Sequence, residues 1–205
     1  MHITLIGMSN IGKSHWSKRL ASQHGFERLH CDGLVERKLV DILRPLGISG
    51  IDGVAKWMGQ PYDPQYAETS ARYLACEIAV MQDILNRIDE APEGKNFVID
   101  TTGSVIYTGE MITRAMGDRT QMFYLQASPA HADKMFRRYI ENPKPVIWDD
   151  VFMPLAGETP QDTLRRCYPV LLETRARRYE RLAHTVIPYE QHRHHKADPA
   201  EIFGL

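Results

Sequence analysis

The residues with the most specific chemistry stand near the start of the chain. Residues 7–14 read Gly-Met-Ser-Asn-Ile-Gly-Lys-Ser and match the pattern G-x-x-x-x-G-K-[ST] in full. In such a loop the backbone amides cradle phosphate oxygens, the lysine neutralises their charge and the last hydroxyl ligates Mg²⁺. The residues predicted to bind the phosphates are Gly7, Met8, Ser9, Asn10, Ile11, Gly12, Lys13, Ser14 and His15. Lys13 is also the predicted catalytic cation, and Ser14 is a predicted magnesium ligand.

The elements expected around this loop suit the same chemistry. Residues 2–6 form an apolar, partly β-branched run that is typical of a buried strand. The apolar spacing from Lys13 to about His24 predicts a helix, whose N-terminus adds partial positive charge beside the loop. A chance glycine turn with an exposed lysine is the alternative. We favour the phosphate loop because the motif stands where a strand passes into a helix.

A second candidate is Asp100, which ends the apolar run Phe97–Asp100. A carboxylate at the tip of a strand can hold Mg²⁺ or its water shell. The alternative is that Asp100 only stabilises the turn at 101–104. We favour the magnesium role because open α/β sheets bind ligands at the carboxyl ends of their strands.

Short apolar strands alternate with long helices along the whole chain. Strands are expected at 2–6, 27–31, 97–100, 122–125 and 185–187, and helices at 13–24, 33–43, 65–90, 107–116, 128–140 and 159–183. The pattern predicts one α/β domain over residues 1–205, a three-layer parallel sheet of about five strands with helices on both faces. The Gly- and Pro-rich segment 45–65 is expected to be an irregular or short-helical insertion. The Pro-rich segment 141–157 is expected to be a mobile lid loop.

Length and composition exclude several other classes of protein. The chain has 205 residues, of which 43% are hydrophobic and 25% charged, and its net charge is −1. Such proportions exclude disordered, collagen-like and membrane proteins, and the balanced charge gives no field that attracts nucleic acid or an anionic membrane. Three widely spaced cysteines indicate reduced thiols. We therefore expect a cytoplasmic monomer or weak dimer whose partner is a small molecule, with no nucleic-acid or membrane partner.

Several segments, among them the loop with its flanks, carry a resemblance to a known family. They are residues 3–20, Asp32 after the second expected strand, Arg137, the Lys-Pro-Val-Ile of 144–147 and the helix segment 173–180. Together they resemble shikimate kinases and their relatives in the nucleoside-monophosphate-kinase-like group of P-loop kinases. In those proteins a nucleotide-contacting arginine precedes a lid that carries a second cation, and a late helix carries an arginine for the substrate carboxylate. The resemblance covers most of the chain, and the segment 45–65 has no counterpart in it.

The resemblance implies ATP and Mg²⁺ as cofactors and a role for each matched residue. Besides Lys13, it makes Asp32, Arg137 and Lys144 catalytic, with Arg137 also at the nucleotide. Asp32, Gly103 and Arg175 become substrate-binding residues. The expected activity is transfer of the γ-phosphoryl group of ATP to a hydroxyl of a small, anionic metabolite.

Four departures put the substrate in doubt. The family's glycine triplet is replaced by residues 100–104, Asp-Thr-Thr-Gly-Ser. The substrate-gripping arginine of the third helix should fall near Leu74, and Arg72 is out of register. The family has two aspartates one residue apart, and His30 stands at the position of the first. Lys144 stands at the position of the family's lid arginine. Shikimate itself is therefore disfavoured as the acceptor.

Other interpretations stay open. Asp32 is an acceptor-hydroxyl ligand in the favoured interpretation and a helix N-cap in the alternative, and His30 is expected to be a packed strand residue. The aromatic residues Trp57, Tyr62, Tyr66 and Tyr73 either line a substrate pocket or pack the insertion, and Trp148 is expected to pack on lid closure. Residues 192–196, His-Arg-His-His-Lys, are expected to be a flexible tail rather than a metal site. The alternative functions are a nucleoside or nucleotide kinase, using Arg72 and Arg175, and a nucleotide-binding protein without turnover.

Overall fold

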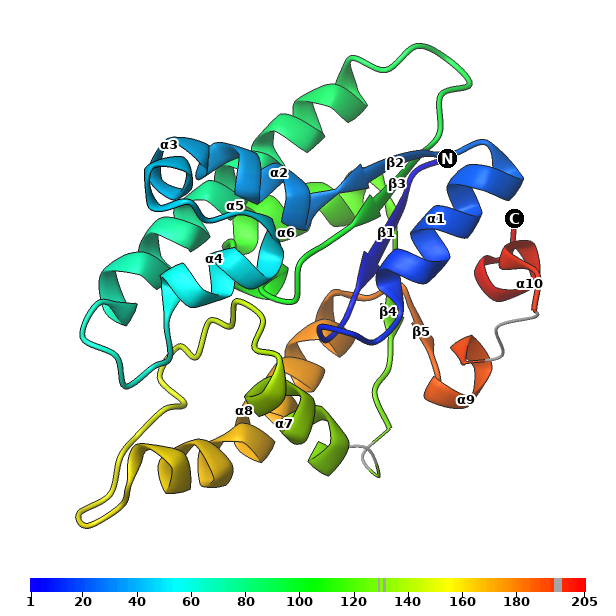
Figure 1. Ribbon diagram of the computed structural model, residues 1–205. Helices are drawn as coiled ribbons and strands as arrows, with labels where there is room; N and C mark the ends of the chain where they lie inside the picture. Colours follow the sequence, from blue (N-terminus) through cyan, green and yellow to red (C-terminus); the bar gives the residue numbers. More distant parts are fainter. Residues whose placement is uncertain (129, 131, 194–196) are drawn as a thin grey trace.

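A five-stranded parallel sheet forms the centre of the molecule. The computed structural model describes residues 1–128, 130, 132–193 and 197–205. The strands lie in the order β2 (Glu27–His30), β3 (Phe97–Asp100), β1 (Ile3–Ile6), β4 (Gln121–Leu125) and β5 (Thr185–Ile187), and every neighbouring pair is parallel (Figure 1). This arrangement confirms the predicted α/β sheet.

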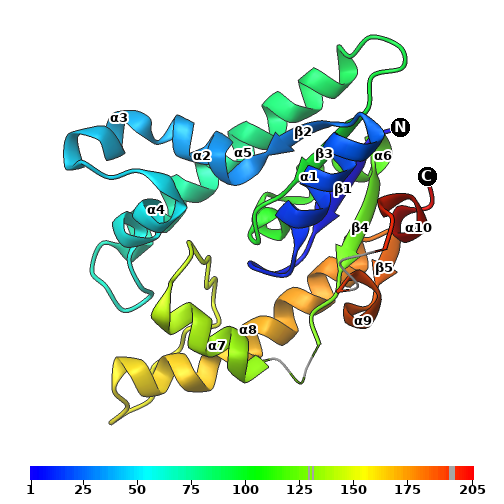
Figure 2. The same cartoon turned by 45° about the vertical axis from the view of Figure 1, so that its right-hand side comes forward.

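Helices cover both faces of the sheet, so all residues of β1 and β3 are buried. One face carries α1 (Lys13–His24), with α10 (Pro199–Phe203) alongside it, and the other carries α5 (Tyr66–Asp89), α6 (Glu110–Arg119) and α8 (Pro160–Leu182). Right-handed crossovers between parallel strands require this division of the helices. Figure 2 shows the layers from the side and the two termini lying near each other.

All strands run in one direction, so their carboxyl ends meet at one edge of the sheet. The register places Leu5 of β1 opposite Asp100 of β3, and Ile6 opposite Tyr124 of β4. The loop after β1, the first turn after β2 and the turn after β3 therefore lie together. This edge is where a doubly wound fold binds its ligands.

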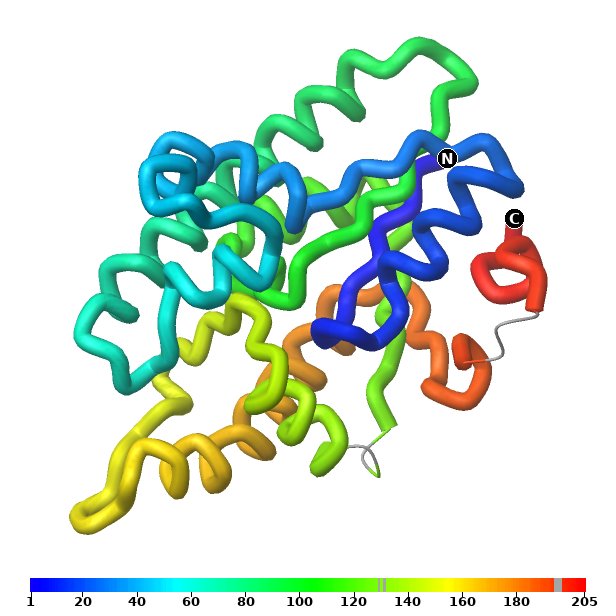
Figure 3. Tube along the Cα trace, in the orientation of Figure 1, coloured from blue at the N-terminus to red at the C-terminus, as the bar shows by residue number. Residues whose placement is uncertain are grey.

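The segment after β2 is helical. It contains α2 (Cys31–Lys38), α3 (Val40–Leu43), the 3₁₀ turn η1 (Arg44–Leu46) and α4 (Gly50–Met58). Helix α4 packs against both α2 and α5 through Val54, Ala55 and Met58, which are buried. The predicted insertion at 45–65 is thus short-helical, and the tube in Figure 3 shows it folding back beside α5.

The expected mobile lid is a packed loop. Helix α7 (Ala132–Glu141) is followed by a loop without helix or strand that leads to α8. Val146, Ile147 and Trp148 in this loop are buried, and Trp148 lies in a second, smaller apolar cluster with Tyr139 and Tyr168. Prolines disfavour regular structure here, and burial of residues 145–148 anchors the first part of the loop, whereas residues 153–157 are exposed. The expected proline at the start of the preceding helix, Pro129, lies outside the described residues.

The remaining short elements differ slightly from expectation. The helix expected at 107–116 is a 3₁₀ turn, η2 (Val105–Tyr107), followed by α6. After β5 the chain forms α9 (Tyr189–His192) before α10. His192 is buried, and its Nε2 lies 2.9 Å from the carbonyl oxygen of Gln126. The tail is therefore packed at His192 rather than flexible, while His194, His195 and Lys196 lie outside the described residues.

Candidate functional site

The loop between β1 and α1 has the geometry that its motif predicts. Gly7 and Gly12 have φ angles of 142° and 119°, and Asn10 adopts the left-handed region with φ 62°. A Cβ atom at Gly7 would lie 2.8 Å from the carbonyl oxygen of Leu125, so the position requires glycine. Gly12 is the N-cap of α1 and carries no side chain to cap the helix. The free N-terminus of α1 therefore points into the loop, where an anion is favoured.

Lys13 is buried inside the loop that precedes it. Its Nζ donates hydrogen bonds to the carbonyl oxygens of Gly7 and Met8, both at 2.8 Å. Burial lowers the pKa of the Lys13 ammonium, while the nearby carboxylates of Asp100 and Asp32 act in the opposite direction. The loop thus holds a cation, partly stripped of water, at the point where phosphates would lie.

Ser14 and Asp100 face the same cavity, and both supply the oxygen ligands that Mg²⁺ prefers. Asp100 is buried, and its Oδ2 accepts hydrogen bonds from Arg28 and, at 3.1 Å, from Ser17 Oγ. These two donors fix the carboxylate in place. The magnesium role of Ser14 and Asp100 stays a prediction, and the residues fit it. In the described part of the chain no three His, Cys, Asp or Glu side chains gather as a metal site.

A cavity of about 430 Å³ opens at the carboxyl ends of β1, β2 and β3, a size that suits a small metabolite. We call it the strand-end cavity. Its lining includes Gly12, Lys13, Ser14, His15, His30, Asp32, Tyr73, Asp100, Gly103, Arg138 and Lys144. The cavity therefore brings together most of the residues that the sequence singled out.

Asp32 lies in the first turn of α2, one residue after its start. The N-cap of this helix is His30, and it makes no side-chain capping bond, so the capping interpretation of Asp32 is wrong. Partial burial raises the pKa of the Asp32 carboxyl, and the charge of Lys13 opposes that shift. His30 is not a packed strand residue either, because it lines the cavity with its Nε2 3.9 Å from Asp32 Oδ2.

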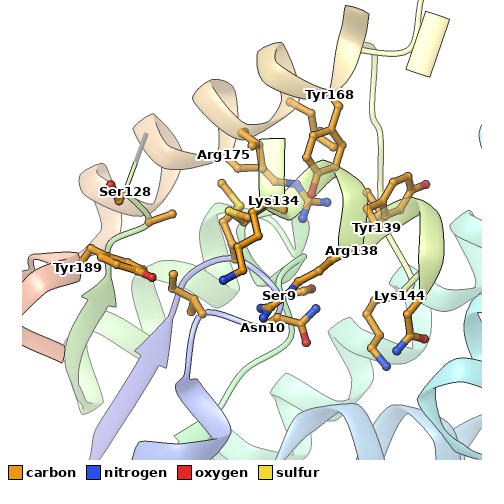
Figure 4. A pocket seen from close by; sticks show the side chains of 18 of the residues that line it. Ser9, Asn10, Ser128, Lys134, Arg138, Tyr139, Lys144, Tyr168, Arg175 and Tyr189 are labelled. Atoms are coloured by element: carbon orange, nitrogen blue, oxygen red, sulfur yellow. The ribbon is translucent and has the colours of Figure 1, made fainter. Parts of the chain in front are cut away.

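A second cavity, the lid cavity, lies between the phosphate loop, α7 and α8. Its lining includes Ser9, Asn10, Ser128, Lys134, Arg138, Tyr168, Leu172, Arg175, Tyr189 and Arg193. Figure 4 shows Lys134 and Arg138 near Ser9 and Asn10, with Tyr189 at the other side of the cavity. The two cavities share residues of the phosphate loop, so one extended ligand can reach both.

Of two adjacent arginines in α7, the structure places Arg138 at the site. Arg138 lines both cavities, whereas Arg137 is exposed and lines neither. Consecutive helical residues differ in direction by about 100°, so neighbours in sequence face different surroundings. Arg138, and not Arg137, is therefore the arginine of α7 that lies at the two cavities.

Lys144 and the lid loop are attached to the helices of the insertion. Lys144 lines both cavities, and its Nζ forms an ion pair with Asp52 of α4. The hydroxyl of Tyr66 donates to the carbonyl of Val146 at 2.8 Å and accepts from the backbone N–H of Trp148 at 2.9 Å. These bonds hold the lid loop over the strand-end cavity.

Arg175 binds backbone rather than facing the strand-end cavity. The side chain is buried in α8, and its Nη2 donates to the carbonyl of Ile147 at 2.7 Å. Its Nη1 approaches the carbonyl of Gly103 at 3.4 Å, and the hydroxyl of Tyr179 donates to the same carbonyl. Arg175 lines the lid cavity only, and it ties the turn after β3 to the lid loop. Arg72 is half-exposed on α5 near Glu68.

The strand order, the phosphate loop after β1 and the lid segment after β4 define a P-loop kinase fold, the fold of shikimate kinases. The shikimate kinase of Bacteroides thetaiotaomicron superposes with a TM-score of 0.61 at 18% identity, covering 100% of this chain and 99% of that one. The Acinetobacter baumannii enzyme, solved with shikimate, gives 0.57 at 20% identity, with 91% and 82% covered. The Aquifex aeolicus enzyme gives 0.53 at 17%, with 100% and 92% covered. No protein-family profile and no curated protein matches the sequence.

No helix in the described ranges combines the length and the apolar character that crossing a bilayer requires.

Cys31 and Cys167 are buried, and Cys76 is partly buried. Burial raises the pKa of the Cys31 thiol, so this residue next to Asp32 is a packed thiol rather than a nucleophile.

Proposed function

We propose that the protein is a phosphotransferase that uses ATP and Mg²⁺ to phosphorylate a hydroxyl group of a small molecule. The observation that carries this proposal is the position of Lys13. Its ammonium lies in a tight phosphate loop, and Lys13 lines the strand-end cavity together with Asp32, whose carboxylate is near enough to influence the pKa of Lys13. A phosphate donor and a hydroxyl acceptor therefore have adjacent places.

The nucleotide occupies the lid cavity and the phosphate loop in this proposal. The loop amides and the N-terminus of α1 bind the phosphates, with Lys13 and Arg138 offsetting their charge. Tyr189 and Leu172 also line the lid cavity and offer apolar contact to a base. Mg²⁺, held by Ser14 and Asp100, supplies further neutralisation of the phosphate oxygens when bound.

Asp32 binds the acceptor hydroxyl and orients it toward the γ-phosphorus. Phosphoryl transfer has a loose transition state, so orientation matters more than early removal of the proton. The raised pKa of Asp32 equips this carboxylate to take the proton as the new bond forms. Lys144 and the lid loop cover the cavity and exclude water, which would otherwise be the acceptor.

The test compares Lys13→Met with the wild-type protein in calorimetric titrations with MgATP and in assays of ADP formation with small polyhydroxy acceptors. Removal of a cation that acts mainly in the transition state lowers turnover by about 10²-fold or more. Lys18→Met is the matched control, because Lys18 is exposed on the same helix. Full activity of Lys13→Met would overturn the proposal. Lys13-dependent binding of MgATP without product from any acceptor would support a binding protein without turnover.

A further inference from the structure

An ion pair joins the lid loop to helix α4, and the proposed reaction gives its acidic partner no role. Asp52 lies in the first turn of α4, and its carboxylate is paired with the ammonium of Lys144. Lys144 lines both the strand-end cavity and the lid cavity, whereas Asp52 lines neither. Asp52 therefore contacts a residue of the site rather than a ligand.

The backbone of Asp52 is held firmly in place. The N–H of Gly50, at the start of α4, donates to Oε1 of Glu36 in α2 at 2.5 Å. A Cβ atom at Gly53 would lie 2.6 Å from Cγ2 of Ile48, so the first turn of α4 packs closely on the chain that precedes it. The first turn of a helix also favours a carboxylate. Asp52 thus offers a negative charge at a defined point.

Lys144, in contrast, stands on a loop and has a flexible side chain. Pro145 follows it and restricts its backbone to extended conformations, but four methylene groups still separate the ammonium from the backbone. Among the residues that the structure describes, Asp52 is the one acidic side chain that pairs with Lys144. An ammonium has three hydrogens, so the pair leaves hydrogens that can bind a ligand oxygen.

The paired ammonium acts on the reacting end of the strand-end cavity. Burial raises the pKa of Asp32, and the charge of Lys144 is one of those that oppose this shift. Lys13 and Arg138 line the same cavity. In phosphoryl transfer, negative charge spreads over the oxygens of the group that passes from nucleotide to acceptor. A cation that lines both cavities is well placed to meet that charge.

We propose that Asp52 is a positioning residue for phosphoryl transfer: its carboxylate holds the Lys144 ammonium beside both cavities, where the ammonium meets the group being transferred. The inference rests on the proposed kinase function. The pair contributes little to stability, because the side chain of Asp52 is 60% exposed and that of Lys144 21%. Its effect therefore falls on the transition state rather than on folding or on binding of the nucleotide.

The test measures by calorimetry how MgADP binds with and without fluoroaluminate, a planar mimic of the phosphoryl group in transfer, so no acceptor has to be known. Lys144→Met is expected to weaken the fluoroaluminate complex by about 10²-fold. Asp52→Asn is expected to weaken it by about tenfold, and the double variant no further than Lys144→Met alone, because Asp52 acts through Lys144. MgADP alone should bind to Asp52→Asn within about twofold of the wild type.

Three further variants separate positioning from other effects. Asp52→Glu keeps the carboxylate and should recover most of the lost affinity. Asp41→Asn removes an exposed carboxylate of the preceding helix α3 and should behave as the wild type. Tyr66→Phe removes the hydroxyl that binds the backbone of the lid loop but leaves the pair of Lys144 and Asp52 in place, so its effect should be smaller than that of Asp52→Asn.

Wild-type affinity of Asp52→Asn for the fluoroaluminate complex overturns the inference, and so does a tighter complex, which would show that Asp52 withholds Lys144 from ligands. An equal loss in Tyr66→Phe, or a large drop in the urea midpoint of Asp52→Asn, would make the role of Asp52 structural. A wild-type protein that binds MgADP equally with and without fluoroaluminate also overturns the inference. Lys13-dependent binding of MgATP would then leave the nucleotide half of the proposed function standing.

Discussion

Arg28 of β2 and Asp100 of β3 form an ion pair beside the first turns of α1. The side chain of Asp100 is only 3% exposed and that of Arg28 20%. The Nε of Arg28 also donates to Ser17 Oγ at 2.7 Å, and Ser17 Oγ donates to Asp100 at 3.1 Å. Three side chains from two strands and one helix thus support the edge of the sheet at which the strand-end cavity opens.

Replacement of Arg28 by methionine is expected to destabilise the fold by about 3 kcal/mol, because it leaves the Asp100 carboxylate buried without its partner. Urea unfolding followed by circular dichroism measures this loss. Arg119→Met is the control, since Arg119 pairs with Asp89 at the surface, and its unfolding midpoint should hardly move. Equal effects of the two substitutions would contradict the importance of the buried pair.

The proposed role of Asp100 as a magnesium ligand can be tested separately. Asp100→Asn is expected to raise the Mg²⁺ concentration for half-maximal ADP formation by about tenfold, because an amide oxygen binds a hard cation less well than a carboxylate does. Asp118→Asn, which changes an exposed residue of α6, should leave the Mg²⁺ dependence unchanged. If Asp100→Asn loses activity but keeps the wild-type Mg²⁺ dependence, Asp100 acts only through its ion pair with Arg28 and does not bind Mg²⁺.

The phosphate loop and the sheet were predictable from the sequence because both depend on local patterns. Residues 7–14 contain the complete motif, and each strand is a short apolar run. The choice between Arg137 and Arg138 was not predictable, since it depends on the rotation of α7 about its axis, which tertiary packing decides. The partners of Arg175 were not predictable either, because every residue has a backbone carbonyl and the sequence does not indicate which of them the side chain binds.

The burial of Glu77 could have been predicted from the sequence, although its partners could not. It lies on the apolar stripe of α5 between Tyr73 and Met81, at helical spacing, and a charged residue on such a stripe is expected to be buried with partners. Its partners Thr102 and Ser104 come 25 and 27 residues later and belong to another element. Only the fold brings them to the carboxylate.

The buried position of Glu77 predicts a pH dependence of stability. The pKa of Glu77 is about 7 in the folded protein, against an ordinary value of 4.5. The folded state therefore binds more protons than the unfolded chain between these values, so the contribution of Glu77 to stability falls as pH rises through this window. Across this window the contribution of Glu77 to the free energy of unfolding changes by roughly 3 kcal/mol in full.

Urea unfolding at about pH 5 and pH 8 measures this effect as the difference between the wild-type protein and Glu77→Gln. The variant lacks the titrating group, so its stability should fall less from pH 5 to pH 8 than that of the wild type. Glu68→Gln, which changes an exposed residue of the same helix, should reproduce the wild-type curve. A wild-type pH dependence in Glu77→Gln would show that other groups cause it.

Trp148 is expected to control the order of the lid. Its side chain is 1% exposed, packs on Tyr139 and Tyr168, and donates from Nε1 to the Tyr139 hydroxyl at 3.2 Å. Removal of a buried tryptophan costs about 3–5 kcal/mol, and here the loss falls on the smaller apolar cluster. Trp148→Ala should therefore speed amide hydrogen exchange in the lid loop and α7 while the sheet keeps its protection. Met153→Ala, an exposed change in the same loop, should leave exchange unaltered. Uniformly faster exchange across the sheet would show instead that the lid and the main core unfold as one unit.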